Sequence, residues 1–349
     1  MTTPVSTSPS PKRHDTVSSN AEGGITDAIR DCSIQEKQRP PGLLKKEVQH
    51  QVYDWREGDP YEPCAGRGFT PYEAYWQKRF KSCHKLFYVC QHVAFWSLGS
   101  KVILKDRPYD ESNIEADNMR FLKENTTVPV PGVIHDWKED DGSYHLIQDR
   151  IDGESLERVW DSLGPEDHDR IASQAAESLV QLRSLTSDKV QNIKGNRCRN
   201  NGLIPKNVGL LEPMSSDDEV WGAMDKSLSH VDQSLRDRLK EKMPPTAPFT
   251  FTHGDLSIVN IMVKDGNFAG LIDLEYSAYF PSWWEYTRNA IWFGYEDRDW
   301  KDMLCKHMRS HNSDNEAAFR WYRACNSLAR NPDGEQAKAR LEELFEGED

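Results

Sequence analysis

The spacing of apolar residues between positions 85 and 150 predicts a small sheet that carries one helix. Two runs rich in β-branched and aromatic residues lie on either side of Gly99-Ser100, which is typical of a hairpin. A stretch of helical composition, residues 110–125, follows them, and two further strands surround the turn Asp140-Asp141-Gly142. We therefore expect the order strand, strand, helix, strand, strand in this part of the chain.

After Gly153 the pattern becomes helical. Gly164-Pro165 marks the start of a helix, because proline is favoured at the first helical position and acidic residues follow in the first turn. Apolar residues then recur at spacings of four, four and three, on one helix face: Ile171, Ala175, Leu179 and Leu182. Residues 190–245 show only weak helices, and residues 283–345 are mostly helical. Between them, two short apolar strands around Asp265-Gly266 predict a tight hairpin.

The N-terminal region lacks such periodicity. Residues 1–20 contain 12 threonine, serine or proline residues, and this composition is typical of a segment that buries no core. We expect residues 1–60 to be disordered or poorly structured. Thr70-Pro71 indicates a helix start, because threonine suits an N-cap and proline suits the next position.

Charge and composition narrow the class of partner. The 349 residues include 44 Lys and Arg against 57 Asp and Glu, a net charge of −13. We expect no nucleic acid partner, because backbone binding depends on clustered basic residues. No apolar stretch approaches the roughly 20 residues that span a bilayer, so we expect no membrane partner. Seven scattered cysteines without a CxxC pair, and an N-terminus without an apolar signal segment, indicate a reduced, cytoplasmic protein. The oligomeric state remains unknown.

The segment 251–277 carries the candidate chemistry. A hairpin that closes at Asp265-Gly266 brings Asn260 and Asp273 together at its open end. A carboxylate and an amide oxygen are hard ligands that suit Mg²⁺. Asp255, five residues before Asn260, is then placed to orient a hydroxyl group and accept its proton.

Each of these residues on its own is better explained by a turn or a helix cap. The combination of His253, Asp255 and Asn260 as H-x-D-x4-N, a hairpin and a strand-ending Asp273 favours the chemical interpretation. His253-Gly254-Asp255 through Asn260, and Ile272-Asp273-Leu274-Glu275, resemble the catalytic motifs of the aminoglycoside phosphotransferase/choline kinase-like family, particularly its large fungal group. The resemblance covers about residues 85–300.

This resemblance implies an α+β, bilobal protein-kinase-like fold. It places a small antiparallel-sheet N-lobe with one main helix at 61–148 and a larger, mostly helical C-lobe at 149–349. It also implies an ATP-dependent phosphotransferase that uses Mg²⁺ on Asn260 and Asp273 and phosphorylates a hydroxyl of a small molecule. Asp255 is the catalytic base in this scheme.

The resemblance also implies three upstream elements of the nucleotide site. Lys105, after the strand 102–104, is expected to pair with the ATP phosphates and with Glu115 on the following helix. Met119 and Leu122 lie four and seven residues after Glu115, which places Glu115 on the inward face. Ser112-x-x-Glu115 is alternatively a capping box. The connection 148–151, with Asp149 and Ile151, is expected to meet adenine through main-chain atoms.

Two other function classes stay open. No glycine-rich phosphate loop is visible before Lys105, which motivates a non-catalytic nucleotide-binding or scaffold protein with a kinase-like fold. A protein kinase is the second alternative, although Ser277 to Pro281 leaves little room for an activation loop. The acceptor itself is not identified.

Residues after the hairpin offer two interpretations each. An acidic group either holds a cationic acceptor or forms a solvated face: Glu285, Glu296, Asp297 and Asp299. An aromatic group either forms the core of the C-lobe or an apolar wall for the acceptor: Trp283, Trp284, Tyr286, Trp292, Phe293 and Tyr295.

Overall fold

The computed structural model describes residues 84–90, 93–98, 101–207, 209–289, 291, 294–309 and 315–346. The chain divides into two compact units, residues 1–89 with 95–102 and residues 90–94 with 103–349. Within the described residues, the first unit contains most of the strands β1 and β2. The predictions for residues 1–60, for a helix after Thr70 and for the turn at Gly99-Ser100 lie outside the described residues.

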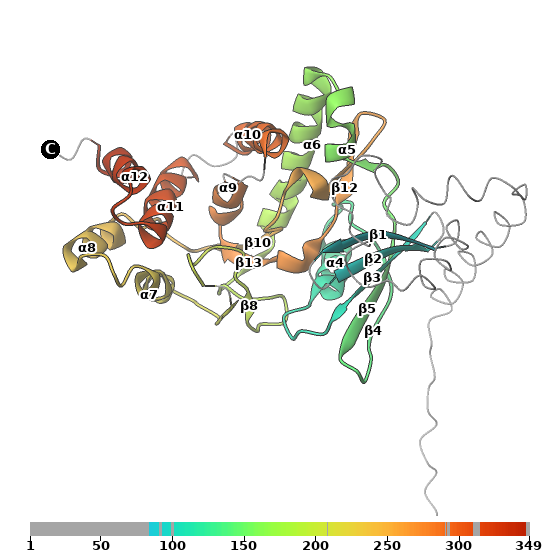
Figure 1. Ribbon diagram of the computed structural model, residues 1–349, viewed down its shortest axis with the longest axis horizontal. Helices are drawn as coiled ribbons and strands as arrows, with labels where there is room; N and C mark the ends of the chain where they lie inside the picture. Colours follow the sequence, from blue (N-terminus) through green and yellow to red (C-terminus); the bar gives the residue numbers. More distant parts are fainter. Residues whose placement is uncertain are drawn as a thin grey trace, which may run out of the picture. The chain divides into compact units, whose positions relative to one another are not determined.

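The element labels follow Figure 1. The strands are β1 (His84–Cys90), β2 (Val93–Leu98), β3 (Val102–Pro108), β4 (Val133–Lys138), β5 (Ser143–Asp149), β6 (Glu154–Ser155), β7 (Thr186–Ser187), β8 (Cys198–Arg199), β9 (Leu210–Leu211), β10 (Phe249–Thr252), β11 (Ile261–Lys264), β12 (Asn267–Leu271) and β13 (Ala278–Pro281). The α-helices are α4 (Glu115–Asn125), α5 (Leu156–Val159), α6 (Pro165–Ser184), α7 (Asp217–Ser227), α8 (Gln233–Glu241), α9 (Trp284–Asn289), α10 (Tyr295–Arg309), α11 (Asn315–Arg330) and α12 (Glu335–Phe345). Short 3-10 turns are η1 (Trp160–Ser162), η2 (Ile258–Asn260) and η3 (Leu274–Tyr276).

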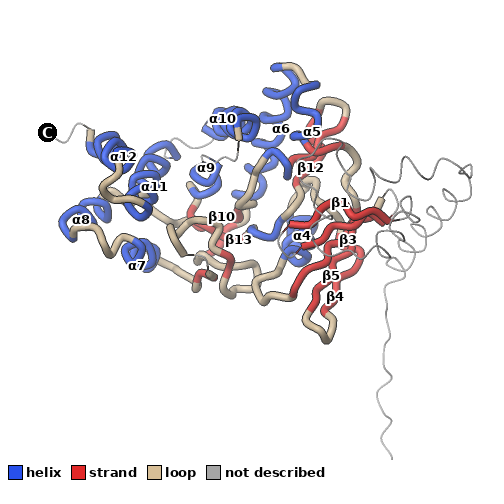
Figure 2. The backbone as a smooth tube through the Cα atoms, in the orientation of Figure 1, coloured by secondary structure: helices blue, strands red, loops and turns tan. Residues whose placement is uncertain are grey.

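In the second unit, β3, β5 and β4 lie side by side in that order (Figure 2). β4 and β5 are antiparallel, with Lys138 opposite Tyr144 next to the predicted turn. Helix α4 follows β3 and buries Ala116, Met119 and Leu122. Glu115 is buried as well, and the spacings of four and three residues from Glu115 to Met119 and Leu122 keep these three on one face, as the sequence predicts.

Helix α6 is the longest described helix and confirms the predicted amphipathic pattern. Pro165 is its first residue, and Gly164 at the N-cap donates its N–H to the carboxylate of Asp167. The four apolar residues of the predicted face are buried: Ile171, Ala175, Leu179 and Leu182. The helix packs against α10, β10 and β12 and so supports the strands that carry the motif residues.

Two antiparallel pairs hold the segment 251–277 in place. In the first, β10 pairs with β13, with Thr252 opposite Ala278. In the second, β11 pairs with β12, with Ile261 opposite Leu271, and the turn between them has positive φ at both Asp265 and Gly266. Such a turn matches the natural twist of a hairpin. The predicted hairpin is therefore confirmed, and its open end lies beside the end of β10.

The rest of the chain is mostly helical, as predicted, and its core is rich in tryptophan. Trp284, Trp300 and Trp321, from α9, α10 and α11, are almost fully buried. None of the helices in the described ranges combines the length and the apolarity that crossing a membrane requires. The α+β class, with a small antiparallel sheet carrying α4 and a larger helical part, is confirmed. The lobe boundaries stay a prediction.

Candidate functional site

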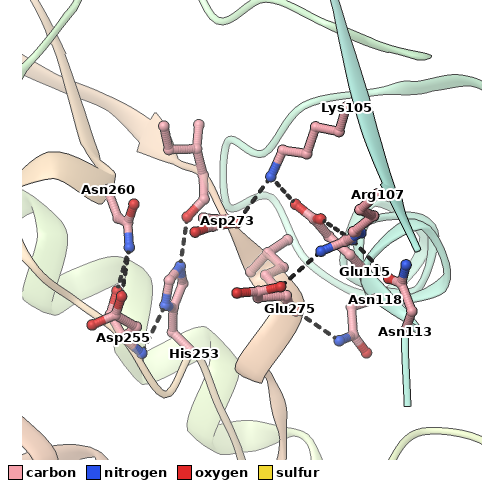
Figure 3. A network of polar contacts seen from close by, with 12 residues as sticks. Lys105, Arg107, Asn113, Glu115, Asn118, His253, Asp255, Asn260, Asp273 and Glu275 are labelled. Carbon is pink, nitrogen blue, oxygen red and sulfur yellow. Dashed lines mark hydrogen bonds and ion pairs between the residues drawn. The ribbon is translucent and has the colours of Figure 1, made fainter. Parts of the chain in front are cut away.

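His253 connects the two loops that carry the predicted catalytic and metal residues. Its ring is completely buried at the end of β10. Nε2 lies 3.0 Å from the carbonyl oxygen of Ile272, and Nδ1 accepts the N–H of Asp255 at 3.2 Å (Figure 3). Burial lowers the pKa of His253, which favours the neutral ring that one donated and one accepted hydrogen bond require. The imidazole thus fixes Asp255 relative to the residue before Asp273.

Asn260 fixes the carboxylate of Asp255. Its Nδ2 donates to both the backbone oxygen and Oδ2 of Asp255, each at 3.0 Å. Figure 3 shows the amide nitrogen of Asn260 toward Asp255 and the amide oxygen on the opposite side. Because the N–H of Ile272 also donates to the backbone carbonyl oxygen of Asn260 at 3.1 Å, Asn260 and Asp273 both lie at the open end of the hairpin. This is the placement that the sequence predicts.

Asp273 has an unusual backbone conformation. Its φ of 67° and ψ of 61° lie in the left-handed region, which costs a residue with a side chain about 1–2 kcal/mol. Burial alone would raise the pKa of Asp273, but the charge of Lys105 and a hydrogen bond from it hold this pKa below its usual range. A strained backbone that aims an ionised carboxylate at a lysine is typical of a functional position.

Lys105 forms the predicted ion pair with Glu115 and a second one with Asp273. Its Nζ lies 2.5 Å from Glu115 Oε1 and 2.9 Å from Asp273 Oδ1. Burial acts to lower the pKa of Lys105, but the charges of Asp273 and Glu115 outweigh it and the pKa is raised. The alternative capping box is not formed, because Ile114 occupies the N-cap of α4 and Glu115 is the first helical residue.

Arg107 is a site residue that the sequence analysis missed. It is buried two residues after Lys105 on β3, and its guanidinium contacts Glu115 Oε2 at 2.6 Å and Glu275 Oε2 at 2.7 Å. Glu275 follows Asp273 by two residues, so two basic side chains meet an acidic pair (Figure 3). The signal was present in the sequence, because residues i and i+2 of a strand point to one face.

Further contacts tie α4 and the segment around β8 to the loop after Asp273. Asn118, completely buried on α4, donates to the carbonyl oxygens of Leu274 at 2.9 Å and Ser277 at 3.0 Å. Arg199 on β8 lies 3.3 Å from Glu275 and 2.9 Å from Asp110. These contacts fix the loop from several sides.

Two of the four acidic residues considered for a cationic acceptor instead bind the backbone of the loop that carries Asp255. Glu285, 3% exposed, accepts the N–H of His253 at 2.5 Å and that of Gly254 at 3.2 Å. Burial raises the pKa of Glu285 to about 7, although these hydrogen bonds oppose the rise. Asp297 is buried, accepts the N–H of Ile258 at 2.9 Å and pairs with Lys301 at 3.0 Å. Neither residue is a solvated face or an open cation site.

The other two acidic residues of that group are exposed, whereas most of the described aromatic residues are buried. Glu296 is exposed, and Asp299 is exposed and pairs with Arg298 at 2.8 Å. Three of the aromatic residues belong to the helical core, and the rings of two of them pack against α11: Trp283 against Trp321, and Trp284 against Tyr322. Tyr286 is the third, Tyr295 is exposed, and Trp292 and Phe293 lie outside the described residues.

The predicted adenine contact lies on the connection between β5 and β6. Asp149 ends β5 with an exposed side chain, and its N–H donates to the carbonyl oxygen of Gly132 at 2.8 Å. Ile151 is partly buried against the close approach of Gly270. The roles of Asp149 and Ile151 toward a nucleotide stay predictions.

Comparison with known proteins identifies relatives. The model of the phosphotransferase enzyme family matches residues 93–338. The aminoglycoside 3′-phosphotransferases of Enterococcus faecalis and Staphylococcus aureus are each 26% identical over 188 residues, which is 52% of this chain. The match spans only 64% and 65% of the length of these two relatives.

Solved structures give more distant similarity. An aminoglycoside phosphotransferase in a ternary complex with streptomycin and ATP has a TM-score of 0.47 at 16% identity, covering 80% of this chain and 97% of its own. A thermostable mutant of another aminoglycoside phosphotransferase, in its apo form, has a TM-score of 0.49 at 12% identity, covering 75% and 93%.

Proposed function

Because the chain belongs to the phosphotransferase enzyme family, we propose that it transfers the γ-phosphoryl group of ATP to a hydroxyl group of a small molecule. The observation that carries the proposal is the position of Lys105, held between Glu115 and Asp273 while Asp255 and Asn260 lie across the same hairpin end. Phosphoryl transfer depends mainly on positioning and electrostatic stabilisation, and this arrangement offers both.

Lys105 is the residue proposed to hold the phosphates. Its raised pKa keeps the ammonium group charged at neutral pH, and the ion pair with Glu115 fixes the direction of the side chain. A compact cation on a rigid strand orients an anionic phosphate chain in a single position. We propose main-chain contacts of Asp149 and Ile151 with adenine on the connection after β5.

The donor set of Asn260 and Asp273 fits Mg²⁺. Both hydrogen bonds that the side-chain amide of Asn260 donates go to Asp255, so the side-chain oxygen of Asn260 is left for a cation. Lys105 keeps Asp273 ionised. A carboxylate, an amide oxygen, water and phosphate oxygens are the ligands that this ion takes. Bound there, Mg²⁺ supplies positive charge that offsets the charge on the transferring phosphoryl group.

Asp255 is the proposed general base. Asn260 holds its Oδ2, whereas its Oδ1 has no hydrogen-bond partner within the described ranges. When the acceptor O–H bond breaks, the proton goes to this carboxylate. The acceptor oxygen then forms a bond to the γ-phosphorus, and the bond from that phosphorus to the β,γ-bridging oxygen breaks to release ADP.

The two alternatives have less support. A non-catalytic protein would not need Asp255, Asn260, Asp273 and Lys105 together, and the chain keeps all four. A protein kinase needs an activation loop after the metal aspartate, but only Leu274 to Ser277 lie between Asp273 and β13.

Transfer of radioactive phosphate tests the proposal. Wild-type protein is incubated with Mg²⁺, γ-labelled ATP and sugars, hydroxy acids or amino alcohols, beside the isosteric variant Asp255→Asn. We expect label in at least one hydroxyl compound with the wild type and strongly reduced label with the variant. Equal labelling by both proteins would refute the assignment of the base, and no transfer to any class would refute the function.

A further inference from the structure

Beside Asp255, a guanidinium group lies in contact with the carboxylate but is not hydrogen bonded to it. Arg288, on α9, has a side chain that is 14% exposed and places one terminal nitrogen 3.8 Å from Asp255 Oδ1. That distance permits electrostatic attraction and is too long for a hydrogen bond. Arg288 Nε and Asp255 Oδ1 are both buried without a hydrogen-bond partner in the part of the chain that the structure describes.

A second unpaired donor comes from a different segment. Asn201, 7% exposed, precedes Gly202 in the segment between β8 and β9, and its Oδ1 accepts the indole N–H of Trp284 at 2.7 Å. Its Nδ2 has no partner among the described residues. This nitrogen lies against Gly254, where an added Cβ would be only 2.5 Å away. The amide nitrogen therefore lies against the loop at Gly254, the residue before Asp255.

The neighbouring polar groups are already occupied. Glu285 accepts two backbone N–H groups, and the hydroxyl of Tyr322 donates to the carbonyl oxygen of Gly202. Neither is hydrogen bonded to Arg288. Unpaired donors are not confined to this place, since Arg107 Nε and Asn113 Nδ2 also lack partners among the described residues. What distinguishes Arg288 is that it faces Asp255 Oδ1 without a hydrogen bond, so a ligand that accepts hydrogen bonds would complete this group of polar atoms.

The chemistry of these donors selects the ligand. A guanidinium group matches a carboxylate in charge and in planar geometry, and an amide N–H adds a further hydrogen bond. A cationic acceptor would instead meet the positive charge of Arg288, while Glu285 and Asp297 are already engaged in internal contacts.

We propose that the acceptor is a hydroxy compound that carries a carboxylate, bound by Arg288 and Asn201, so that its hydroxyl reaches Asp255. This proposal rests on the phosphotransferase function proposed above, because it names the class of acceptor for that reaction. The carboxylate gives Arg288 a hydrogen-bonded partner, and Oδ1 of Asp255 becomes available to the hydroxyl.

Matched pairs of compounds test it: glycerate and glyceramide, 3-hydroxybutyrate and 3-hydroxybutyramide, gluconate and glucose. Binding is measured by ligand-detected NMR with and without Mg·ATP, and transfer by phosphorus NMR. For at least one pair we expect the carboxylate to bind at least about tenfold more tightly than its neutral partner, the factor that one charge-assisted hydrogen bond supplies.

Variants of Arg288 and Asn201 test whether these two residues cause the preference for a carboxylate. Arg288→Met is expected to remove the preference for the carboxylate by raising its KM, and Arg288→Lys to keep part of it. Asn201→Ala is expected to weaken the preference severalfold. The control Arg298→Met removes a partly exposed arginine paired with Asp299, and is expected to keep the full preference. Retained Mg·ATP binding shows that each variant is folded.

Three results would overturn the proposal. The first is equal binding of carboxylates and neutral partners, including no binding of either. The second is preference for a cationic compound such as kanamycin over every carboxylate. The third is a loss of kcat in Arg288→Met that is the same for all acceptors, because Arg288 would then act only through Asp255. Failure of the wild-type protein to bind Mg·ATP would instead refute the proposed function. The two failures can be distinguished, because binding of the carboxylate is also measured without the nucleotide.

Discussion

On the side of the site proposed for the nucleotide, buried charged groups form close ion pairs, whereas the guanidinium beside Asp255 lies too far from the carboxylate for a hydrogen bond. Lys105 and Arg107 meet Glu115, Asp273 and Glu275 at distances from 2.5 to 2.9 Å. Arg288, by contrast, lies 3.8 Å from Asp255 Oδ1. Among the described residues, single polar atoms without a hydrogen-bond partner occur on both sides: Arg107 Nε, Asn113 Nδ2 and Asn118 Oδ1 on the first, and Asp255 Oδ1, Arg288 Nε and Asn201 Nδ2 on the second.

The difference suggests a division of roles within the site. The paired side is preorganised without a ligand, which suits a part that every phosphoryl transfer from ATP would use in the same way. On the side of Asp255 and Arg288, no hydrogen bond joins the two charged groups, so the identity of the acceptor is expected to depend on the groups there. Changes on the two sides should therefore have separable effects.

Asp255→Asn is expected to have the largest effect. The amide keeps the shape of the side chain but cannot take up the proton of the acceptor hydroxyl. Turnover should fall by about 10²–10⁴, the usual contribution of a general base, while Mg·ATP binding stays near that of the wild type. Phosphate transfer at saturating substrate measures the first quantity, and calorimetric titration the second. A rate within a few-fold of the wild type would contradict the assignment.

Arg107→Met tests the paired side. The substitution leaves Glu115, completely buried, with only Lys105, and leaves Glu275 without its closest cation. Breaking a buried ion pair from one side costs about 3–5 kcal/mol of unfolding free energy. Urea unfolding measures this loss.

The matched control is Arg120→Met. Arg120 is 45% exposed on α4 and pairs with Asp136 at the surface. Exposed pairs contribute about 0–1 kcal/mol, so this variant should lose far less stability than Arg107→Met. Similar losses in the two variants would show that the buried network has no special importance.

Glu285 gives a smaller effect that depends on pH. Its pKa rises from an ordinary 4.5 to about 7, so the folded protein holds a proton that the unfolded chain releases. The free energy of unfolding should fall as pH rises from 4.5 to 7 and level off above 7, with a span of at most about 3 kcal/mol. The difference in unfolding free energy between the wild type and Glu285→Gln, measured at each pH, isolates the contribution of this residue. A difference that is constant with pH would contradict the raised pKa.

The sequence predicted what short-range spacing controls. The hairpin turn, the amphipathic face of α6 and the inward direction of Glu115 follow from the periods of helices and strands. The same reasoning could have identified Arg107, since it shares a strand face with Lys105. Glu285, Asp297, Asn201 and Arg288 were not, because their partners in the catalytic loop are far away in the sequence. Only tertiary packing decides whether such a charge is solvated, buried or available to a ligand.

Thermal unfolding with ATP, with and without Mg²⁺, tests the central claim most directly, using wild type, Asp273→Asn and Asp255→Asn. At a concentration of Mg·ATP about 100 times its Kd, the wild type should gain about 2.7 kcal/mol of stability. We predict that this gain requires Mg²⁺, disappears in Asp273→Asn and persists in Asp255→Asn. No stabilisation of the wild type by Mg·ATP, or an equal gain in Asp273→Asn, would contradict the account.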